Sequence, residues 1–132
     1  MKFQPDTLGG VNAITRQEPG RVWVGTTAHT HSIVVPWQGA VQVWGAATMD
    51  DLTPAHFERL AALDPELVVF GSGSRLRFPS AALLRALIDR GIGVETMDTP
   101  AACRTYNVLA SEGRSVVAAL VLEPQVSPAE NL

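Results

Sequence analysis

The sequence is poor in cysteine, in lysine and in long apolar runs. A single cysteine, Cys103, excludes an internal disulfide framework, and with only three histidines few soft ligands remain for a closed metal site. The one lysine and nine arginines are scattered and the net charge is −3, so no basic stripe is available for nucleic acid. The longest apolar stretches, such as 67–70 and 116–122, are too short to cross a bilayer. We therefore expect no metal site, no nucleic-acid partner and no membrane span.

What remains is typical of a globular domain. The 132 residues are 46% apolar and 17% charged, which is the balance of a chain that buries one core. We expect a single domain over 1–123, a loosely held lead-in over 1–10, and a flexible tail over 124–132 that carries two prolines. The N-terminus has neither an apolar signal region nor an Arg-rich transit pattern, so a cytoplasmic location is expected. A monomer is the expected oligomeric state.

The first half of the chain predicts short strands joined by tight links. β-rich runs cover 11–15, 21–25, 29–35 and 40–44, with turn residues such as Glu18-Pro19-Gly20 between them. Links of this length join only antiparallel neighbours. The first half therefore predicts an antiparallel layer.

The second half alternates strand and helix patterns. Thr53 and Pro54 predict a helix to about Leu63, and Asp98-Thr99-Pro100 predicts another that ends near Gly113. Between these two helices, the pattern predicts a strand at 67–70, then a helix that Pro79 opens and Gly91 closes, and then a strand at 92–96. A final strand is predicted at 115–122. The βαβαβ order predicts parallel strands with helices packed on the sheet. The fold class is therefore a mixed, three-layer α/β fold with antiparallel strands first.

The carboxyl edge of this parallel unit is the best candidate site. Gly71-Ser72-Gly73 and Asp98-Thr99 would leave the sheet at the same edge, where ligands of open α/β sheets bind. A helix beginning at Thr99 would present free N–H groups to a small anion. The glycine loop lacks the third glycine of a dinucleotide fingerprint and the Lys-Ser/Thr pair of a P-loop, so no cofactor is predicted. The alternative is that both glycines only satisfy positive φ and that Asp98 or Thr99 only caps its helix.

Two further features of the last predicted helix attract attention. Arg104, Asn107 and Ser111 share one face and could recognise an anion or a partner, although an ordinary solvated face gives the same spacing. Cys103 lies near the helix start, where the dipole could lower its thiol pKa; the alternative is a small buried side chain. No catalytic residue is assigned.

Histidines and a tryptophan in the first half of the chain are weaker candidates for a metal site and for a protein interface. His29 and His31 would project from one face of a predicted strand and could begin a zinc site. No third ligand is identified, so a partly exposed strand surface is the favoured explanation. Trp37, in a turn, is a candidate interface residue, unless it folds back on its own sheet.

Several short motifs, in this order along the chain, resemble those of a known family. They are Val69-Phe70-Gly71-Ser72-Gly73, Gly91-Ile92-Gly93-Val94-Glu95, Ala102-Cys103-Arg104-Thr105-Tyr106-Asn107-Val108-Leu109 and Glu112-Gly113-Arg114. From Phe3 to about Glu123 the chain resembles the small α/β family that includes mitochondrial respiratory complex I assembly factor three. The resemblance implies a three-layer mixed fold and, in mitochondrial members, a non-enzymatic assembly role. Without their targeting extension, the chain looks like a bacterial relative.

Two functional hypotheses follow. The first is a protein-binding or assembly accessory domain with a protein partner of unknown identity. The second is a small-anion-binding domain, or a cryptic enzyme, that uses Gly71-Ser72-Gly73 and the helix N-terminus at Thr99. A concave site with convergent N–H groups favours the ligand, and an exposed apolar patch favours the partner protein.

Overall fold

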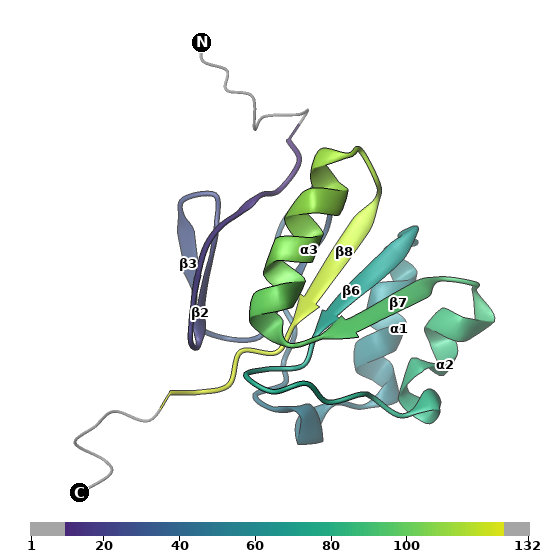
Figure 1. Ribbon diagram of the computed structural model, residues 1–132. Helices are drawn as coiled ribbons and strands as arrows, with labels where there is room; N and C mark the ends of the chain where they lie inside the picture. The colour runs from purple at the N-terminus through teal and green to yellow at the C-terminus, as the bar shows by residue number, and fades with distance from the viewer. Residues whose placement is uncertain (1–9, 126–132) are drawn as a thin grey trace, which may run out of the picture.

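The computed structural model describes residues 10–125 of the chain (Figure 1). The expected lead-in before residue 10 and most of the expected tail, from residue 126 on, lie outside the described residues. The elements, in chain order, are β1 (Ile14–Glu18), β2 (Arg21–Val24), β3 (Thr27–His29), β4 (Ile33–Val35), β5 (Gln42–Val43), η1 (Met49–Asp51), α1 (Pro54–Ala62), β6 (Leu67–Gly71), α2 (Ala81–Asp89), β7 (Gly93–Met97), α3 (Thr99–Ser111) and β8 (Val116–Leu120).

Two sheets are formed. β1, β2 and β3 make an antiparallel sheet in that order, and a second sheet has the order β5-β4-β8-β6-β7. In the second sheet β6 lies parallel to both β7 and β8, whereas β4 lies antiparallel to β8 and to β5. The predicted mixed α/β class, with antiparallel strands first and a parallel βαβαβ unit second, is confirmed.

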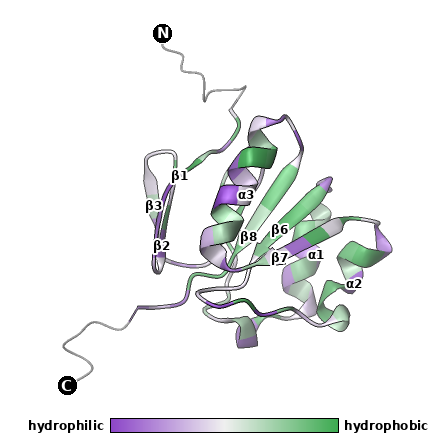
Figure 2. Ribbon diagram, viewed as in Figure 1, coloured by the Kyte–Doolittle hydropathy of each residue, from purple (hydrophilic) through white to green (hydrophobic). Residues whose placement is uncertain are grey.

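Each face of the five-stranded sheet has its own apolar core. On one face Val68 and Phe70 of β6 pack with α1, α2 and the fully buried Trp44. On the other face Val69 packs with the buried side of α3 and with the three-stranded sheet. Figure 1 shows α3 and α1 on opposite sides of the sheet, and Figure 2 shows β6 and β8 coloured as apolar along their length. A continuous apolar run is what a strand covered on both faces requires.

Local signals set where the helices begin. The Thr53 N–H donates to Nδ1 of His56 (3.0 Å), and Asp98 Oδ1 accepts from the Ala101 N–H (2.9 Å), so Thr53 and Asp98 are N-caps as predicted. α2 differs from the prediction, because Ser80 is its N-cap and Pro79 lies outside the helix. Gly91, at φ +70°, follows the end of α2, as the sequence predicts.

The strands of the first half correct the sequence prediction in two places. β1 begins at Ile14 and runs to Glu18, three residues later than predicted. The predicted strand over 29–35 is two strands in different sheets: β3 ends at His29 and β4 begins at Ile33. The chain changes sheets between them, where the buried Ser32 accepts a hydrogen bond from the Leu122 N–H (2.9 Å). This partner is 90 residues away, so the break has no local signal.

Candidate functional site

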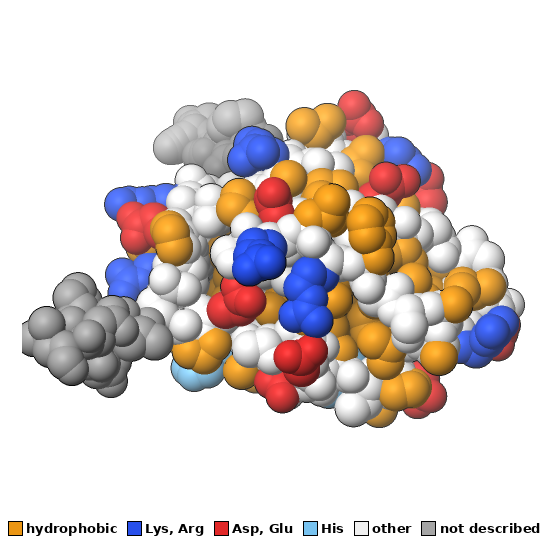
Figure 3. Space-filling model, turned by 60° about the horizontal axis from the view of Figure 1, so that its bottom comes forward, with side chains coloured by type: hydrophobic (Ala, Val, Ile, Leu, Met, Phe, Trp, Pro, Cys, Tyr) orange, Lys and Arg blue, Asp and Glu red, His pale blue; other side chains and the backbone are white. Residues whose placement is uncertain are grey.

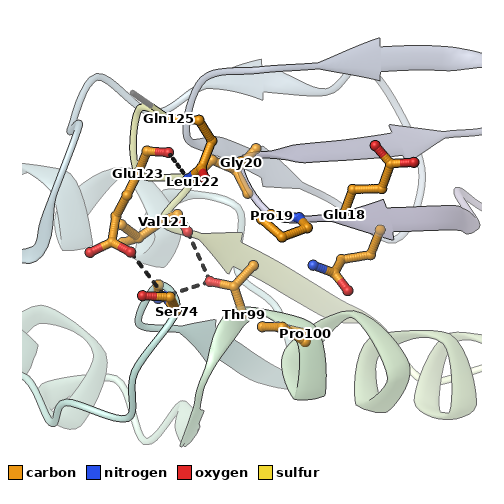
Figure 4. A pocket seen from close by; sticks show the side chains of 12 residues that line it. Glu18, Pro19, Gly20, Ser74, Thr99, Pro100, Val121, Leu122, Glu123 and Gln125 are labelled. Carbon is orange, nitrogen blue, oxygen red and sulfur yellow. Dashed lines mark hydrogen bonds between the residues drawn. The ribbon is translucent and has the colours of Figure 1, made fainter. Parts of the chain in front are cut away.

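The carboxyl ends of β6, β7 and β8 meet at one edge of the sheet. Gly71 pairs with Met97 of β7 and with Leu120 of β8. The glycine loop, the start of α3 and the segment after β8 therefore lie together, as Figure 4 shows. The sequence predicts the first two of these neighbours, and β8 adds the third.

Gly71 is required by close packing between strand and helix. A Cβ at this position would lie 2.9 Å from Thr99 Oγ1 and 3.0 Å from Thr99 Cα. The expectation of positive φ holds for Gly73, at +107°, and is wrong for Gly71. Gly71 therefore lets α3 approach β6, and Gly73 turns the chain away from the sheet.

Thr99 joins three segments through buried hydrogen bonds. Its Oγ1 accepts from the Gly73 N–H (2.9 Å) and donates to the Val121 carbonyl (2.8 Å), while its own N–H donates to the Gly73 carbonyl (2.8 Å). The residue is only 4% exposed. Thr99 therefore fixes the geometry of this edge of the sheet.

The first turn of α3 uses its N–H groups within the protein. Thr99 donates to Gly73, and Pro100 has no N–H. The next two amides donate to Asp98, Ala101 to the side chain and Ala102 to the carbonyl (2.9 Å each). The expectation of free donors at this helix end is therefore wrong, because the cap and the glycine loop occupy them.

Ser72 organises the loop that follows β6. Its Oγ donates to the Arg75 carbonyl (2.6 Å) and accepts from the Arg77 N–H (3.0 Å), and its N–H donates to Met97 (2.9 Å). The residue is 1% exposed. A buried hydroxyl engaged in this way shapes the loop from within.

A carboxylate of the chain itself lies against the glycine loop. Glu123 Oε1 accepts from the Ser74 N–H (3.0 Å), and a Cβ on Gly73 would come within 2.9 Å of the Glu123 carboxyl group. Figure 4 shows this contact beside a hollow of about 230 Å³ whose lining also includes Glu18 and Pro19. A small anion at this loop is one of the two alternatives from the sequence, and the structure places the Glu123 carboxylate against the Ser74 N–H of the loop. β8 lies parallel to β6, so its continuation reaches this edge, which is the signal that could have identified Glu123.

Arg104 and Asn107 lie over a different hollow. The Asn107 side chain accepts from the Ile14 N–H (2.9 Å) and donates to the Ile14 carbonyl (2.7 Å), so it joins α3 to β1. Arg104 is exposed beside a shallow hollow of about 280 Å³ between α3 and β1. The predicted set is thus divided: Gly73 and Thr99 line one hollow, and Arg104 and Asn107 line another.

Cys103 is buried, and His29 and His31 lie in different segments. Burial raises the pKa of the Cys103 thiol to about 12, and the smaller opposing effect of Arg104 does not offset this. Of the two alternatives from the sequence, the small buried side chain is therefore the one that the structure shows. His29 ends β3, but His31 lies in the following link, so the two do not share a strand. Within residues 10–125, no group of three or more His, Cys, Asp or Glu side chains is arranged to hold a metal ion.

The remaining aromatic candidate packs back on its own molecule. Trp37 is half-buried, and its Nε1 donates to the Ala110 carbonyl at the end of α3 (3.1 Å). This is the second of the two placements that the sequence leaves open; an interface role for Trp37 stays a prediction. The hydroxyl of Tyr106 nearby lies 2.9 Å from the Asn12 carbonyl and 3.2 Å from the Pro36 carbonyl, so its one proton has two acceptors within reach. Burial raises the pKa of this hydroxyl.

The sequence of this chain matches a family model and several known proteins. The model described as "Protein of unknown function (DUF498/DUF598)" matches residues 14–121. The "NADH dehydrogenase [ubiquinone] 1 alpha subcomplex assembly factor 3" of Bos taurus is 43% identical over 89 residues, which cover 66% of this chain and 48% of that protein. The chain thus spans about half the length of this curated relative.

Solved structures are similar over almost the whole chain. A crystal structure of a Bordetella parapertussis protein has a TM-score of 0.83 at 35% identity, covering 88% of this chain and 99% of that one. The solution structure of a Bordetella pertussis protein, titled a Mth938-like domain, has a TM-score of 0.81 at 29% identity and covers 100% of this chain and 98% of that one. No helix within residues 10–125 is long and apolar enough to span a bilayer.

Proposed function

This chain belongs to the DUF498/DUF598 family, and from that premise we propose that it is a non-enzymatic accessory domain that binds a protein during the assembly of a larger complex. The observation that carries the proposal is the identity of 43% to a protein named as an assembly factor. The matched 89 residues are 66% of this chain and 48% of that relative, so the proposal rests on the part that the two proteins share.

The geometry of the carboxyl edge supports this proposal over chemistry at that edge. The side chains of Ser72 and Thr99 are both buried, and each makes two hydrogen bonds to the backbone of the chain itself. Buried, satisfied polar groups of this kind stabilise one backbone arrangement, whereas a general base or nucleophile needs access to a substrate. The edge therefore serves as a junction that holds loop, helix and C-terminal segment together.

The small-anion alternative has one observation in its favour. The Ser74 N–H already holds a carboxylate, that of Glu123, against the glycine loop. A loop that accepts an internal carboxylate has the geometry to accept an external one where Glu123 is removed. Ligand binding by Gly71-Ser72-Gly73, Asp98 and Thr99 therefore stays a prediction, with Glu123 as its competitor.

Co-purification from the native host tests the proposed function. The tagged chain is purified beside an unrelated tagged protein of the same size, and co-purifying proteins are quantified by mass spectrometry. We expect one protein to be enriched reproducibly with this chain alone. The Trp37→Ala and Arg104→Ala variants, compared at equal folded fraction, test whether either side chain takes part. Absence of any enriched protein across independent preparations would contradict the proposal.

A further inference from the structure

The loop after the glycine turn exposes two large apolar side chains, Leu76 and Phe78, in a segment in which every residue is exposed. Residues 74–78 are all exposed, and among them Leu76 is 54% and Phe78 is 72% exposed. The value for Phe78 is the highest of any large apolar side chain in residues 10–125. Apolar side chains that lie close together on a surface mark contact sites more often than single scattered ones do.

The loop is held in place despite this exposure. Ser72 Oγ bonds to the Arg75 carbonyl (2.6 Å) and to the Arg77 N–H (3.0 Å), and the Ser74 N–H donates to Glu123 (3.0 Å). The Arg77 guanidinium also pairs with Asp50 at 3.1 Å. Since the backbone is ordered before any partner arrives, binding here loses little further conformational entropy.

The charges of the loop indicate what would cover it. Arg75 and Arg77 alternate with Leu76 and Phe78, and within residues 10–125 Arg75 has no ion-pair partner. Figure 3 shows apolar, basic and acidic side chains side by side on the face at the bottom of Figure 1, where this loop runs. Of the carboxylates near the loop, Asp50 pairs with Arg77 and Glu123 accepts from the Ser74 N–H, so neither is paired with Arg75. A surface that combines apolar side chains with an unpaired cation is complementary to apolar side chains flanked by carboxylates.

We propose that residues 75–78 are a docking segment for an acidic amphipathic segment of a partner protein. Apolar side chains of the partner cover Leu76 and Phe78, and one of its carboxylates pairs with Arg75. This inference rests on the proposed function, because it names the surface that the partner of the accessory domain uses. Phe78 and Leu76 supply most of the affinity, and Arg75 selects the sign of the partner's charge.

Two synthetic peptides test the docking segment. Both are 15 residues long and helix-forming, with Leu at i, i+3, i+4 and i+7; one carries Glu and the other Lys at the flanking positions. Fluorescence anisotropy measures binding of each labelled peptide to the whole chain. The Glu peptide is expected to bind at least about tenfold more tightly than the Lys peptide. The Leu76→Ser/Phe78→Ser variant loses about tenfold or more in affinity, and Arg75→Glu reverses the preference between the peptides.

Val108→Ser is the matched control, because Val108 is 56% exposed on α3, away from this loop. It leaves the affinity for the Glu peptide unchanged. Equal affinities for the two peptides, or an unchanged affinity in the Leu76→Ser/Phe78→Ser variant, would overturn the proposal. Binding to phosphatidylglycerol vesicles through Phe78, with no binding of the Glu peptide, would overturn it in favour of a lipid surface.

The peptide titration tests the docking segment and the co-purification tests the proposed function, so either proposal can be contradicted without the other. If the enriched protein is retained by the Leu76→Ser/Phe78→Ser variant, this docking segment is wrong and the proposed function stands. If the Glu peptide binds as expected and no protein is enriched from the host, the proposed function is wrong and the loop is a surface that binds acidic amphipathic segments.

Discussion

The side chain of Asn107 pairs with both backbone groups of Ile14, 93 residues earlier in the chain. Its Oδ1 lies 2.9 Å from the Ile14 nitrogen and its Nδ2 lies 2.7 Å from the Ile14 oxygen, so the amide replaces a neighbouring strand at this point of β1. The three-stranded sheet is thereby fastened to α3 by a polar contact in addition to the apolar core.

Replacing Asn107 by Ala is therefore expected to destabilise the fold by about 2 kcal/mol, because a part-buried backbone N–H and carbonyl lose their partners. Urea unfolding followed by tryptophan fluorescence measures the change. Arg104→Ala, one turn earlier and exposed, is the matched control and is expected to change the free energy of unfolding by less than about 0.5 kcal/mol. Equal effects of the two variants would show that Asn107 belongs to an ordinary solvated face.

Gly71→Ala is expected to cost about 1–3 kcal/mol, because the added methyl group would lie 2.9 Å from Thr99 Oγ1 and 3.0 Å from the Thr99 backbone. Gly93→Ala is the matched control: it also lies in a strand without positive φ, and its Cβ meets only the flexible end of Leu67, at 3.3 Å. Thermal unfolding of the two variants provides the comparison. A larger loss for Gly93→Ala would contradict the close approach of α3 to β6.

Removing the Glu123 carboxylate is expected to expose an anion site. In Glu123→Ala the Ser74 N–H loses its acceptor, and sulfate should then shift the Ser74 amide resonance in a concentration-dependent way. The wild-type chain should show a much smaller shift, since its own carboxylate holds the position. Identical titrations of both proteins would end the small-anion alternative at this loop.

High pH is expected to destabilise the fold through Cys103 and Tyr106. Burial raises the pKa of the Cys103 thiol from its ordinary value of 9.0 to about 12 and also raises that of the Tyr106 hydroxyl. The folded state therefore binds these protons more tightly than the unfolded state, so their contribution is complete below pH 9 and is lost as the pH rises toward 12. Urea unfolding between pH 8 and pH 11 measures the decline, and Cys103→Ala should reduce its slope. An unchanged slope in this variant would contradict the burial of the thiol.

The sequence predicts best where the signals are local. Thr53 and Asp98 cap helices through bonds within three residues, and the apolar run of β6 identifies a strand covered on both faces. The single strand predicted over 29–35 is wrong because the chain changes sheets within it. The hydrogen bond at the break, from the Leu122 N–H to Ser32, joins residues 90 positions apart, so a local pattern does not indicate it. The start of α2 fails because Ser80, and not Pro79, supplies the cap.

The same distinction applies to the candidate site. The meeting of the glycine loop with Asp98 and Thr99 follows from parallel strand order and is therefore predictable. The occupation of that loop by Glu123 and the pairing of Asn107 with Ile14 are not, because each joins side chains to backbone groups 49 and 93 residues away. Residue type and spacing identify polar groups, but only the fold decides whether their partners lie within the chain or outside it.

Photo-crosslinking in the native host tests the central claim most directly, with a benzophenone side chain placed at position 76 or, as the control, at position 108. We predict that the protein enriched by co-purification is trapped covalently from position 76 and not from position 108, both of which are exposed in this structure. A chain that traps no protein from position 76, or the same amount from both positions, would contradict the account.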